Sequence, residues 1–376
     1  MTEPPMPKLI AFNLPQFHPI PENDEWWGKG FTEWTNVVKA RPLYKGHYQP
    51  HLPADLGFYD LRVPEARVAQ AEMARAYGIH GFCYYHYWFN GKRLLERPVN
   101  EIMASGEPDF PFCLCWANEV WSRGWQGESR NILQVQVYSS ADDERHSAWL
   151  ARVFGDRRYV RFNDRPIFLL FSVPGHPDPA RFCEFLREAC RPAGEEDPYL
   201  IGVDGHCAFQ DTRPFGFDTT LHFEPQLGAL PGCFSENFSL RRLIRNLSLG
   251  IMSGRLKAYD YRKARRLMNR VEIEFPSVPC MLVGWDNTSR RNERGSFLVN
   301  NSPEVFGTEL ETSLLAWLNK PQQDDLFFLN AWNEWAEGNH LEPDQRFGLS
   351  YLQTVKEVLS RLEASRKVEV NESHCV

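Results

Sequence analysis

The sequence lacks the cysteine spacing that marks a disulfide framework or a zinc site. It contains 9 cysteines, an odd number, and no two of them stand in a Cys-x-x-Cys pair. Cys113 and Cys115 are neighbours on one predicted strand, and we interpret them as packing residues. Cysteine usage of this kind is typical of a reduced compartment.

Targeting and membrane-spanning patterns are also missing. Residues Met1–Pro5 are acidic and proline-rich, without the apolar centre of a secretory leader. No apolar run approaches the length of a membrane-spanning helix, so we expect no membrane span. Together with the cysteine usage, these observations predict a cytoplasmic protein.

Several binding motifs are absent as well. A net charge of −7 argues against general nucleic-acid binding, which depends on Lys and Arg. The phosphate-binding Gly-x-x-x-x-Gly-Lys-Ser/Thr loop and the Gly-x-Ser-x-Gly turn of serine hydrolases do not occur. No Asp-x-Asp pair occurs either, a motif common in metal-dependent nucleotide-sugar transferases. We therefore expect no nucleic-acid partner and no cofactor.

Aromatic residues, by contrast, are abundant. They make up 14% of the 376 residues and include 12 tryptophans. Such an excess fits carbohydrate binding, and it also fits a large core. The 43% hydrophobic and 24% charged residues are ordinary for a soluble globular protein. The length suits one large α/β barrel or two ordinary domains.

Eight short apolar runs recur along the chain, and most are followed by a helical pattern. The predicted strands are Leu9–Leu14, Ile79–Tyr84, Phe112–Cys115, Pro166–Phe171, Tyr199–Val203, Thr219–Phe223, Cys280–Val283 and the run that begins at Leu326. The predicted helices are Pro64–Tyr77, about Leu94–Ala104, Asp142–Phe154, Pro179–Cys190, Ser302 to about Leu318, and Leu349 to about Ala364.

Near-continuous apolar strands joined by helices indicate a parallel sheet, and eight such units predict an α/β fold of the (β/α)8 TIM-barrel type in a single domain. A doubly wound sheet is the alternative, but it requires a glycine-rich turn after the first strand, where Pro15-Gln16-Phe17-His18 stands. We assign residues 1–366 to the barrel, with a basic inserted arm at 239–270, and expect a disordered tail at 367–376.

The most informative stretch runs from Leu326 to Gly338. It starts as a buried strand and ends in Glu334 and Glu337, set among Trp332, Asn333 and Trp335. Glycosidic bond cleavage needs two carboxyl groups, about 5–5.5 Å apart for a retaining reaction and roughly 6.5–9.5 Å for an inverting one. Two readings follow: both glutamates are catalytic, or one is catalytic and the other binds the substrate. A surface turn with two solvated carboxylates is the alternative.

Other strands also end in polar or aromatic residues, as expected when their carboxyl ends line one site. The substrate-binding candidates from this pattern are His18, His86, Trp116, Asn118, Glu119, Glu224, Trp285, Asp286, Asn333 and Trp335. Glu119, Glu224, Asp286 and Glu334 are predicted to open onto one face. Glu119 is a second candidate acid or base, or an ordinary loop acid. His18 and His86 are either functional or structural, and because they lack metal-ligand spacing we predict no metal.

These stretches together resemble the WbsX family, which is also described as glycoside hydrolase family 99-like. The resemblance rests on Leu14-Pro15-Gln16-Phe17-His18-Pro19, Gly28-Lys29-Gly30-Phe31-Thr32-Glu33-Trp34, His80-Gly81-Phe82-Cys83-Tyr84-Tyr85-His86-Tyr87-Trp88-Phe89, Cys115-Trp116-Ala117-Asn118-Glu119, Gly284-Trp285-Asp286-Asn287-Thr288 and Asn333-Glu334-Trp335-Ala336-Glu337-Gly338. It implies a (β/α)8 barrel encoded with polysaccharide or O-antigen genes and commonly labelled a glycosyltransferase.

The more distant family 99 proper contains endo-acting α-mannosidases with a similar Asn-Glu-Trp-x-Glu-Gly stretch. There the first Glu assists the sugar's own 2-hydroxyl group, giving an anhydro-sugar intermediate, and the second is the general acid/base. The resemblance implies these roles for Glu334 and Glu337. Two positions depart from the family pattern: Asn13 stands where Tyr is expected, and Val120 where Asn is expected.

The sequence therefore favours a carbohydrate-active enzyme, a retaining, endo-mannosidase-like glycoside hydrolase acting on a polysaccharide or glycan. A glycosyltransferase of lipopolysaccharide O-antigen or capsule biosynthesis is the first alternative, with the same fold and an activated sugar donor. A non-catalytic carbohydrate-binding barrel is the second, and the intact Glu334–Glu337 pair counts against it.

Overall fold

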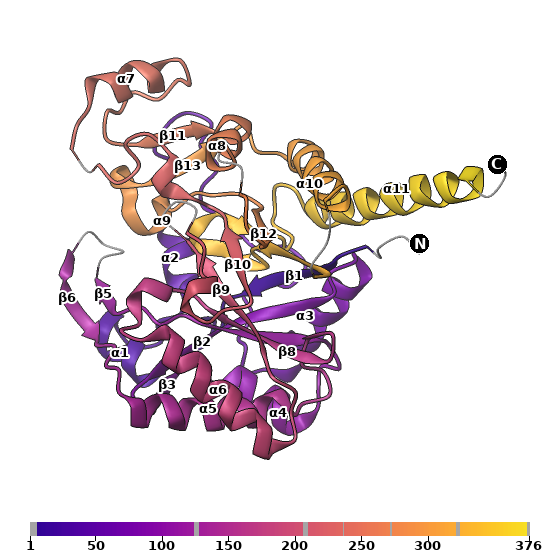
Figure 1. Ribbon diagram of the computed structural model, residues 1–376. Helices are drawn as coiled ribbons and strands as arrows, with labels where there is room; N and C mark the ends of the chain where they lie inside the picture. Colours follow the sequence, from indigo (N-terminus) through magenta and orange to yellow (C-terminus); the bar gives the residue numbers. More distant parts are fainter. Residues whose placement is uncertain are drawn as a thin grey trace.

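The computed structural model describes residues 6–123, 128–205, 210–235, 237–270, 273–320 and 324–373. Its centre is a closed barrel of parallel strands (Figure 1). In chain order the barrel strands are β1 (Lys8–Asn13), β2 (Gly81–Phe89), β4 (Phe112–Trp116), β8 (Arg165–Leu170), β9 (Tyr199–Asp204), β10 (Thr219–Phe223), β12 (Ser277–Leu282) and β14 (Leu326–Asn330).

Strand β1 closes the barrel, because it pairs in parallel with β14 on one side and with β2 on the other. Each remaining strand pairs with its neighbours in chain order. Every one of the eight predicted strands is present, and the prediction of a (β/α)8 barrel is confirmed. The barrel strands are apolar and buried on both faces, as expected for a parallel sheet that is covered by helices.

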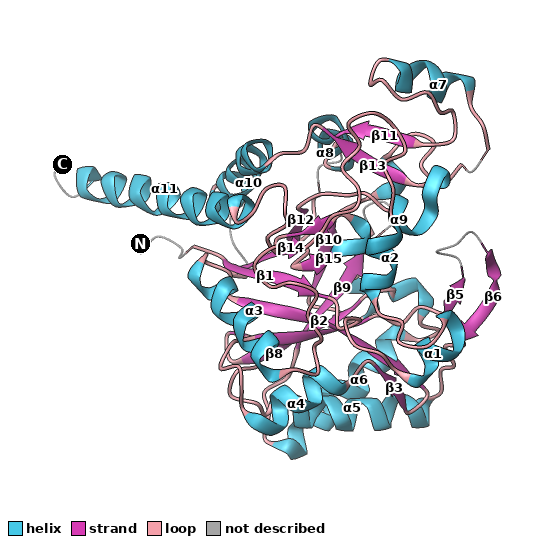
Figure 2. Cartoon of the chain, turned by 180° about the vertical axis from the view of Figure 1, so that it is seen from behind, coloured by secondary structure: helices cyan, strands magenta, loops and turns pink. Residues whose placement is uncertain are grey.

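Helices cover the outside of the barrel (Figure 2). They are α3 (Pro64–Ala76), α4 (Arg97–Ser105), α5 (Ser140–Phe154), α6 (Pro179–Ala193), α8 (Tyr261–Met268), α10 (Pro303–Leu318) and α11 (Ser350–Ser373). Among the described residues, the β9–β10 connection holds only the single 3-10 turn Arg213–Phe215. Helix α5 begins where the Ser139 side chain caps the Asp142 N–H group, with Asp142 and Asp143 favourable to the helix dipole.

Smaller elements lie at the end of the barrel where the carboxyl ends of the strands meet. They are α1 (Pro21–Trp27), α2 (Glu33–Lys39), α9 (Thr288–Arg291), the hairpin β15 (Asn333–Glu334) with β16 (Asn339–His340), and the hairpin β5 (Trp121–Arg123) with β6 (Glu128–Gln134). Two short strands pair in antiparallel fashion with barrel strands: β3 (Lys92–Leu94) with β2, and β7 (Arg161–Phe162) with β8.

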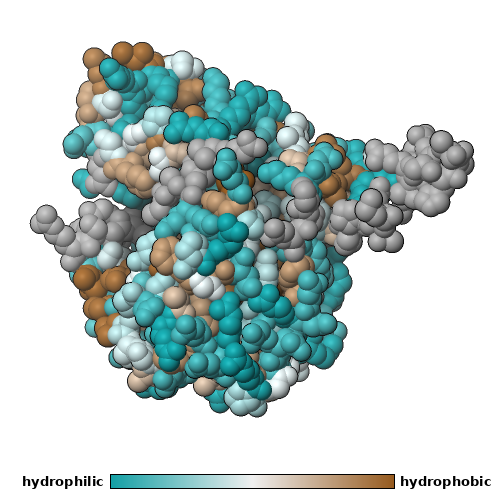
Figure 3. Space-filling model, in the orientation of Figure 1, coloured by the Kyte–Doolittle hydropathy of each residue, from teal (hydrophilic) through white to brown (hydrophobic). Residues whose placement is uncertain are grey.

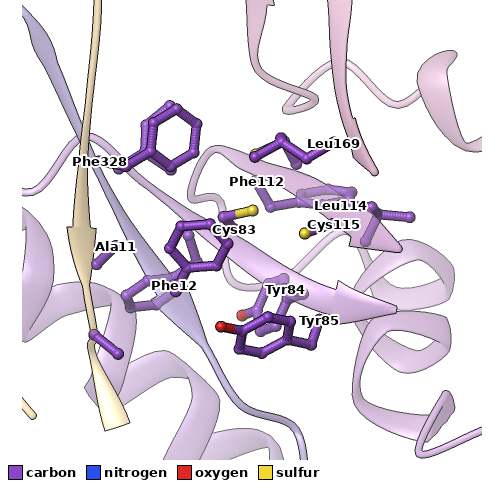
Figure 4. Packing of buried hydrophobic residues seen from close by; sticks show 14 of the residues in the cluster. Ala11, Phe12, Cys83, Tyr84, Tyr85, Phe112, Leu114, Cys115, Leu169 and Phe328 are labelled. Carbon is purple, nitrogen blue, oxygen red and sulfur yellow. The ribbon is translucent and has the colours of Figure 1, made fainter. Parts of the chain in front are cut away.

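The barrel interior is filled by aromatic and sulfur-containing side chains (Figure 4). The Phe12 ring lies 5.3 Å from the Phe223 ring, 5.4 Å from Tyr85 and 5.5 Å from Phe328, measured between centroids. Cys83, Cys113 and Cys115 are buried free thiols of the same core cluster, as the sequence predicted for Cys113 and Cys115. This packing makes the barrel a solid support with its cavity at one end.

The predicted arm at 239–270 contains α7 (Leu240–Leu247), β11 (Lys257–Asp260) and α8. β11 pairs in parallel with β13 (Ser296–Val299), and α7 stands away from the barrel (Figure 1). Helix α11 runs to Ser373, past its predicted end near Ala364, and residues 374–376 of the predicted tail lie outside the described residues. In the described part of the chain, no helix combines the length and apolar character needed to cross a membrane.

Candidate active site

A cavity of about 260 Å³ opens where the carboxyl ends of the barrel strands meet. Its walls contain three carboxylates, three amides, one arginine and a set of aromatic rings. The charged and amide wall residues are Glu119, Glu334, Glu337, Gln16, Asn23, Asn330 and Arg290. The aromatic ones are Trp27, Tyr85, Tyr87, Trp121, Phe171, Phe223 and Trp285. The position at the carboxyl end of the barrel is where enzymes of this fold place their active sites.

A tight turn after β14 carries both glutamates of the predicted pair. β15 and β16, of two residues each, pair as a hairpin, and the 3-10 turn Trp335–Glu337 lies between them. Gly338 ends the turn with φ of +56°, and a Cβ atom there would lie only 2.9 Å from Asp286 Cβ. Glycine is therefore required at this position. The turn directs the side chains of Glu334 and Glu337 into the same cavity.

Arg290, from α9, joins the two carboxylates. Its Nη1 atom lies 2.5 Å from Glu337 Oε1, and its Nη2 atom lies 3.6 Å from Glu334 Oε2. The same Nη2 atom lies 2.8 Å from Oε1 of Glu33, a fully buried residue of α2. One guanidinium thus faces three carboxylates, which an arginine can do because its donors form a rigid fork.

The site raises the pKa of both glutamates. Burial raises the pKa of Glu334 well above its ordinary value, and the neighbouring Glu337 charge adds to the shift. Burial also raises the pKa of Glu337, against the lowering effect of Arg290. Because Arg290 is nearer to Glu337, we infer that a single shared proton resides mainly on Glu334 in the free protein.

Asn333 and Trp335, also predicted to bind substrate, do not line the cavity. Their side chains hold the turn in place through hydrogen bonds to neighbouring segments. The Asn333 side chain accepts a hydrogen bond from the Leu14 N–H group at 2.7 Å and donates to the Leu14 carbonyl at 3.1 Å, which ties the turn to the end of β1. The Trp335 ring is buried, and its Nε1–H donates to Glu342 Oε2 at 2.6 Å. The expectation that Trp335 lies at the pocket is not met.

His86 and Trp116 point away from the cavity. Tyr85 and Tyr87 of β2 face into it, so the alternation of side chains along a strand turns His86 outward. His86 there lies 2.9 Å from His146 of α5, Nε2 to Nε2, and Trp116 packs edge-on against the same His146 ring at 4.5 Å. Both are core residues between barrel and helices, which corrects the prediction that they line the site.

Three more predicted substrate-binding residues, His18, Asn118 and Glu224, do not line the cavity. His18 is buried outside the cavity, and burial lowers its pKa to about 4. Asn118 joins two strand ends, donating to the Ser172 carbonyl and accepting from the Ser172 N–H group. Glu224 is buried and accepts hydrogen bonds from Arg265 of α8 at 3.1 and 3.2 Å.

Of the four acids predicted to share a face, Glu119 and Glu334 line the cavity, whereas Glu224 and Asp286 do not. Glu119 is exposed at the cavity mouth. Asp286 lines a second, neighbouring cavity, where its Oδ2 atom lies 2.7 Å from His47 Nε2. Trp285 lines both cavities, as predicted for a pocket tryptophan.

The sequence reasoning missed several cavity residues. Arg290 stands two positions after the Gly284–Thr288 motif, and the need of a buried carboxylate pair for a cation was the available signal. Gln16, in the first motif, and Asn23 line the cavity with buried side-chain atoms that have no hydrogen-bond partner among the described residues: Gln16 Oε1, Asn23 Oδ1 and Asn23 Nδ2. Such atoms call for a polar ligand or water.

Comparisons with known proteins agree with this architecture. The Bacteroides thetaiotaomicron GH99 endo-alpha-mannosidase superposes with a TM-score of 0.56 over 96% of this chain and 98% of its own, at 11% identity. A structure titled "Glycoside hydrolase-like protein" superposes with a TM-score of 0.58, covering 95% of each chain at 13% identity. At these identities the likeness shows the fold alone.

Two relatives found by sequence share a higher identity with this chain than the solved structures do. Two proteins of Xanthomonas campestris pv. campestris, from strains B100 and ATCC 33913, are each named "Uncharacterized protein WxcX" and are 41% identical over 355 residues, 94% of this chain. The chain spans about half the length of these relatives. Residues 9–355 match the family described as "Glycosyltransferase WbsX", and the chain therefore belongs to that family.

Proposed function

We propose that this protein is a carbohydrate-active enzyme that cleaves a glycosidic bond with retention, with Glu334 and Glu337 as the reacting carboxyl groups. One observation carries the proposal: two glutamates share a cavity and one guanidinium, and burial raises the pKa of both. A pair that holds one proton has an acid and a base available together near neutral pH.

The remaining walls support a sugar as the ligand. Ring faces of tryptophan and tyrosine are the usual surfaces for the apolar faces of sugars, and Trp27, Tyr87 and Trp121 lie in the wall. The unpartnered amide atoms of Gln16 and Asn23 suit hydroxyl groups, which both donate and accept hydrogen bonds. We therefore propose a polysaccharide or glycan as the substrate class.

In the proposed reaction Glu334 removes the proton of the sugar's 2-hydroxyl group, whose oxygen attacks C1. Glu337 gives its proton to the leaving glycosidic oxygen as the C1–O bond breaks, which yields a 1,2-anhydro sugar. Glu337 then takes a proton from the water that opens this ring at C1, and Glu334 returns its proton to the 2-hydroxyl group. The two inversions at C1 give overall retention.

These roles require the proton on Glu337 in the complex, whereas the free protein favours it on Glu334. A shift of Arg290 toward Glu334 when substrate binds would move the proton, because the nearer carboxylate is the one whose charge the guanidinium stabilises. If Arg290 stays on Glu337, the two roles exchange. Variants of each glutamate, tested below, distinguish these cases.

The family's description favours one alternative, a glycosyltransferase. That enzyme would use the same cavity with an activated sugar donor, and its location in surface-polysaccharide assembly is part of that alternative. One experiment separates the functions: incubation with panels of polysaccharides and of nucleotide-sugars, with released reducing sugar and released nucleotide as the two readouts. Glu334→Gln is the control.

Released sugar that depends on Glu334 supports the hydrolase. Nucleotide release that depends on Glu334 supports the transferase. Binding of a polysaccharide without either product, unchanged in Glu334→Gln, would leave only a non-catalytic carbohydrate-binding barrel.

A further inference from the structure

The second cavity, of about 620 Å³, contains a cluster of metal-ligand atoms outside the proposed reaction. His51 comes from the loop before α3, His340 from β16, and Asp344 from the segment after it. One ligand atom from each residue lies within 4.8 Å of the other two. His51 Nδ1 is 3.0 Å from His340 Nε2, and His340 Nε2 is 3.9 Å from Asp344 Oδ2.

The ring and carboxylate orientations suit an ion. His340 Nδ1 donates to the Glu342 carbonyl at 2.9 Å, so in the neutral ring Nε2 carries the lone pair that faces the cluster. Asp344 Oδ1 accepts from the N–H groups of Arg346 and Phe347, which leaves Oδ2 for the cluster.

We propose that His51, His340 and Asp344 bind one divalent transition-metal ion of the zinc class. Two imidazoles and one carboxylate are ligands that such ions accept, and the cavity leaves room for a water as a further ligand. Ligands about 2.0–2.2 Å from an ion in tetrahedral arrangement lie roughly 3.3 Å apart, so Asp344 has to move toward the two rings to bind the same ion.

The ion would brace the turn that carries the two catalytic candidates. The His340 ring stacks on Trp335 with centroids 3.8 Å apart, and Trp335 lies between Glu334 and Ala336 in the turn. Backbone hydrogen bonds, such as Gln345 N–H to the Leu52 carbonyl, already join the two segments that supply the ligands. The site therefore links the loop before α3 to the turn.

Zinc binding tests this proposal without reference to activity. The full chain is stripped with a chelator, loaded with Zn²⁺, desalted and measured for metal content, with affinity from a competition titration. We expect one ion per wild-type chain, and a loss of affinity of at least about 10- to 100-fold in His51→Ala and Asp344→Asn. His80→Ala, which removes an exposed histidine elsewhere, should bind as wild type does.

Circular dichroism shows whether each variant is folded, and Co²⁺ absorption in the wild type gives a second readout of nitrogen and oxygen ligation. A wild-type chain that holds no ion after loading would overturn the site. So would folded His51→Ala and Asp344→Asn variants that both retain wild-type affinity.

A separate observation concerns α7, whose amphipathic pattern is reversed. Two of its polar residues, Arg242 and Asn246, face the protein. Arg242 donates to backbone carbonyls of Gly232 and Gly254, and Asn246 donates to those of Ser253 and Leu256. Its apolar side chains face solvent, with Leu240, Ile244 and Leu247 more than half exposed. Soluble proteins normally bury the apolar stripe of a helix.

Basic residues are frequent in the arm, and Arg241 lies on α7 itself. Within residues 237–270 the exposed basic side chains are Arg241, Arg255, Arg262, Lys263, Arg266 and Arg270, and Asp260 is the only acidic residue. The protein as a whole carries −7. Phe238 and Met252 add exposed apolar area next to α7, and the hydrophobic colour gathers over α7 in Figure 3.

We propose that this arm docks on an anionic lipid surface. Apolar side chains with flanking arginines match interfacial helices, which bury their apolar face at the headgroup level and attract anionic lipids. The basic charge of the arm favours an anionic partner. The apolar stripe favours a lipid surface rather than a soluble polyanion as that partner. Docking would hold the cavity close to lipid-borne glycans, and this last step rests on the proposed function.

Vesicle co-sedimentation tests the docking alone. We expect the full chain to sediment with vesicles that contain phosphatidylglycerol, more weakly with pure phosphatidylcholine, and less as salt rises. A double variant, Leu240→Asp with Ile244→Asp, should lose at least about tenfold in partitioning. Leu315→Asp, at an exposed leucine of α10, is the matched control and should bind as wild type does.

Absence of vesicle binding in the wild type, or equal binding by the double variant, would overturn the proposal. A wild-type dimer in light scattering that the double variant converts to a monomer, without vesicle binding, would assign the stripe to a second copy and also overturn it.

Discussion

The Arg290 guanidinium lies 2.5 Å from the Glu337 carboxylate, and it is the cation nearest to both members of the candidate pair among the described residues. From this contact we infer that Arg290 decides which of the two carboxyl groups holds the proton. The buried Glu33 side chain binds the same guanidinium and therefore also holds Arg290 in position.

We predict that Arg290→Lys moves the acid limb of the kcat/KM–pH profile to higher pH. A lysine ammonium cannot contact three carboxylates at once, so the ionised form of the pair loses stabilisation and its pKa values rise. The fall in kcat/KM at neutral pH should be at least about tenfold, or about 1.4 kcal/mol. Arg181→Lys, on the surface of α6, is the control. An unchanged profile in Arg290→Lys would exclude this role.

Stability should depend on pH through Glu342. Burial raises the pKa of this carboxyl group to about 7 in the folded protein, against 4.5 as its ordinary value. A raised carboxyl pKa stabilises the fold below the unfolded value, and that contribution is lost as pH rises from about 4.5 through 7. The loss for Glu342 is roughly 3 kcal/mol at most.

Glu342→Gln cannot ionise, so its free energy of unfolding should change less between pH 5 and pH 8 than that of the wild type. Urea unfolding at both pH values measures the difference. Other buried acids, such as Asp324, contribute equally to both proteins and cancel in the comparison. Identical pH dependence in the two proteins would show that Glu342 is not the titrating group.

Tryptophans of the cavity and of the core should respond differently to substitution. Trp121→Ala removes a ring from the cavity wall and should weaken glycan binding by roughly 1–3 kcal/mol, measured by calorimetry. Trp116→Phe changes a buried ring outside the wall and should leave that affinity unchanged while lowering the melting temperature. If Trp116→Phe weakened glycan binding and Trp121→Ala did not, the sugar would have to bind on the side of β4 where Trp116 lies, and not in the cavity.

The fold could be predicted well from the sequence because each barrel strand is a short apolar run with a helix pattern after it. The direction of each side chain could not, since strands of a parallel barrel are apolar on both faces. His86 and Trp116 were therefore assigned to the cavity, whereas Tyr85 and Tyr87 line it.

The Glu334–Glu337 pair was found because both carboxylates stand in one short turn. Arg290 was missed because its contact with them joins residues 44 or more positions apart, which no local pattern reveals. Gln16 and Asn23 show the same limit, since their unpartnered atoms are visible only in the packed structure.

The most direct measurement is the activity of Glu334→Gln and Glu337→Gln on two sugar substrates that differ only in the leaving group. Glu337→Gln cannot donate a carboxylic proton, so it should lose roughly 10²–10⁴-fold on a poor leaving group and far less on an activated phenol. Glu334→Gln should lose activity on both, because the assisting base is needed whatever leaves. Exchanged patterns would exchange the two roles, whereas near-wild-type activity of either variant on both substrates would contradict the account and move the chemistry to Glu119.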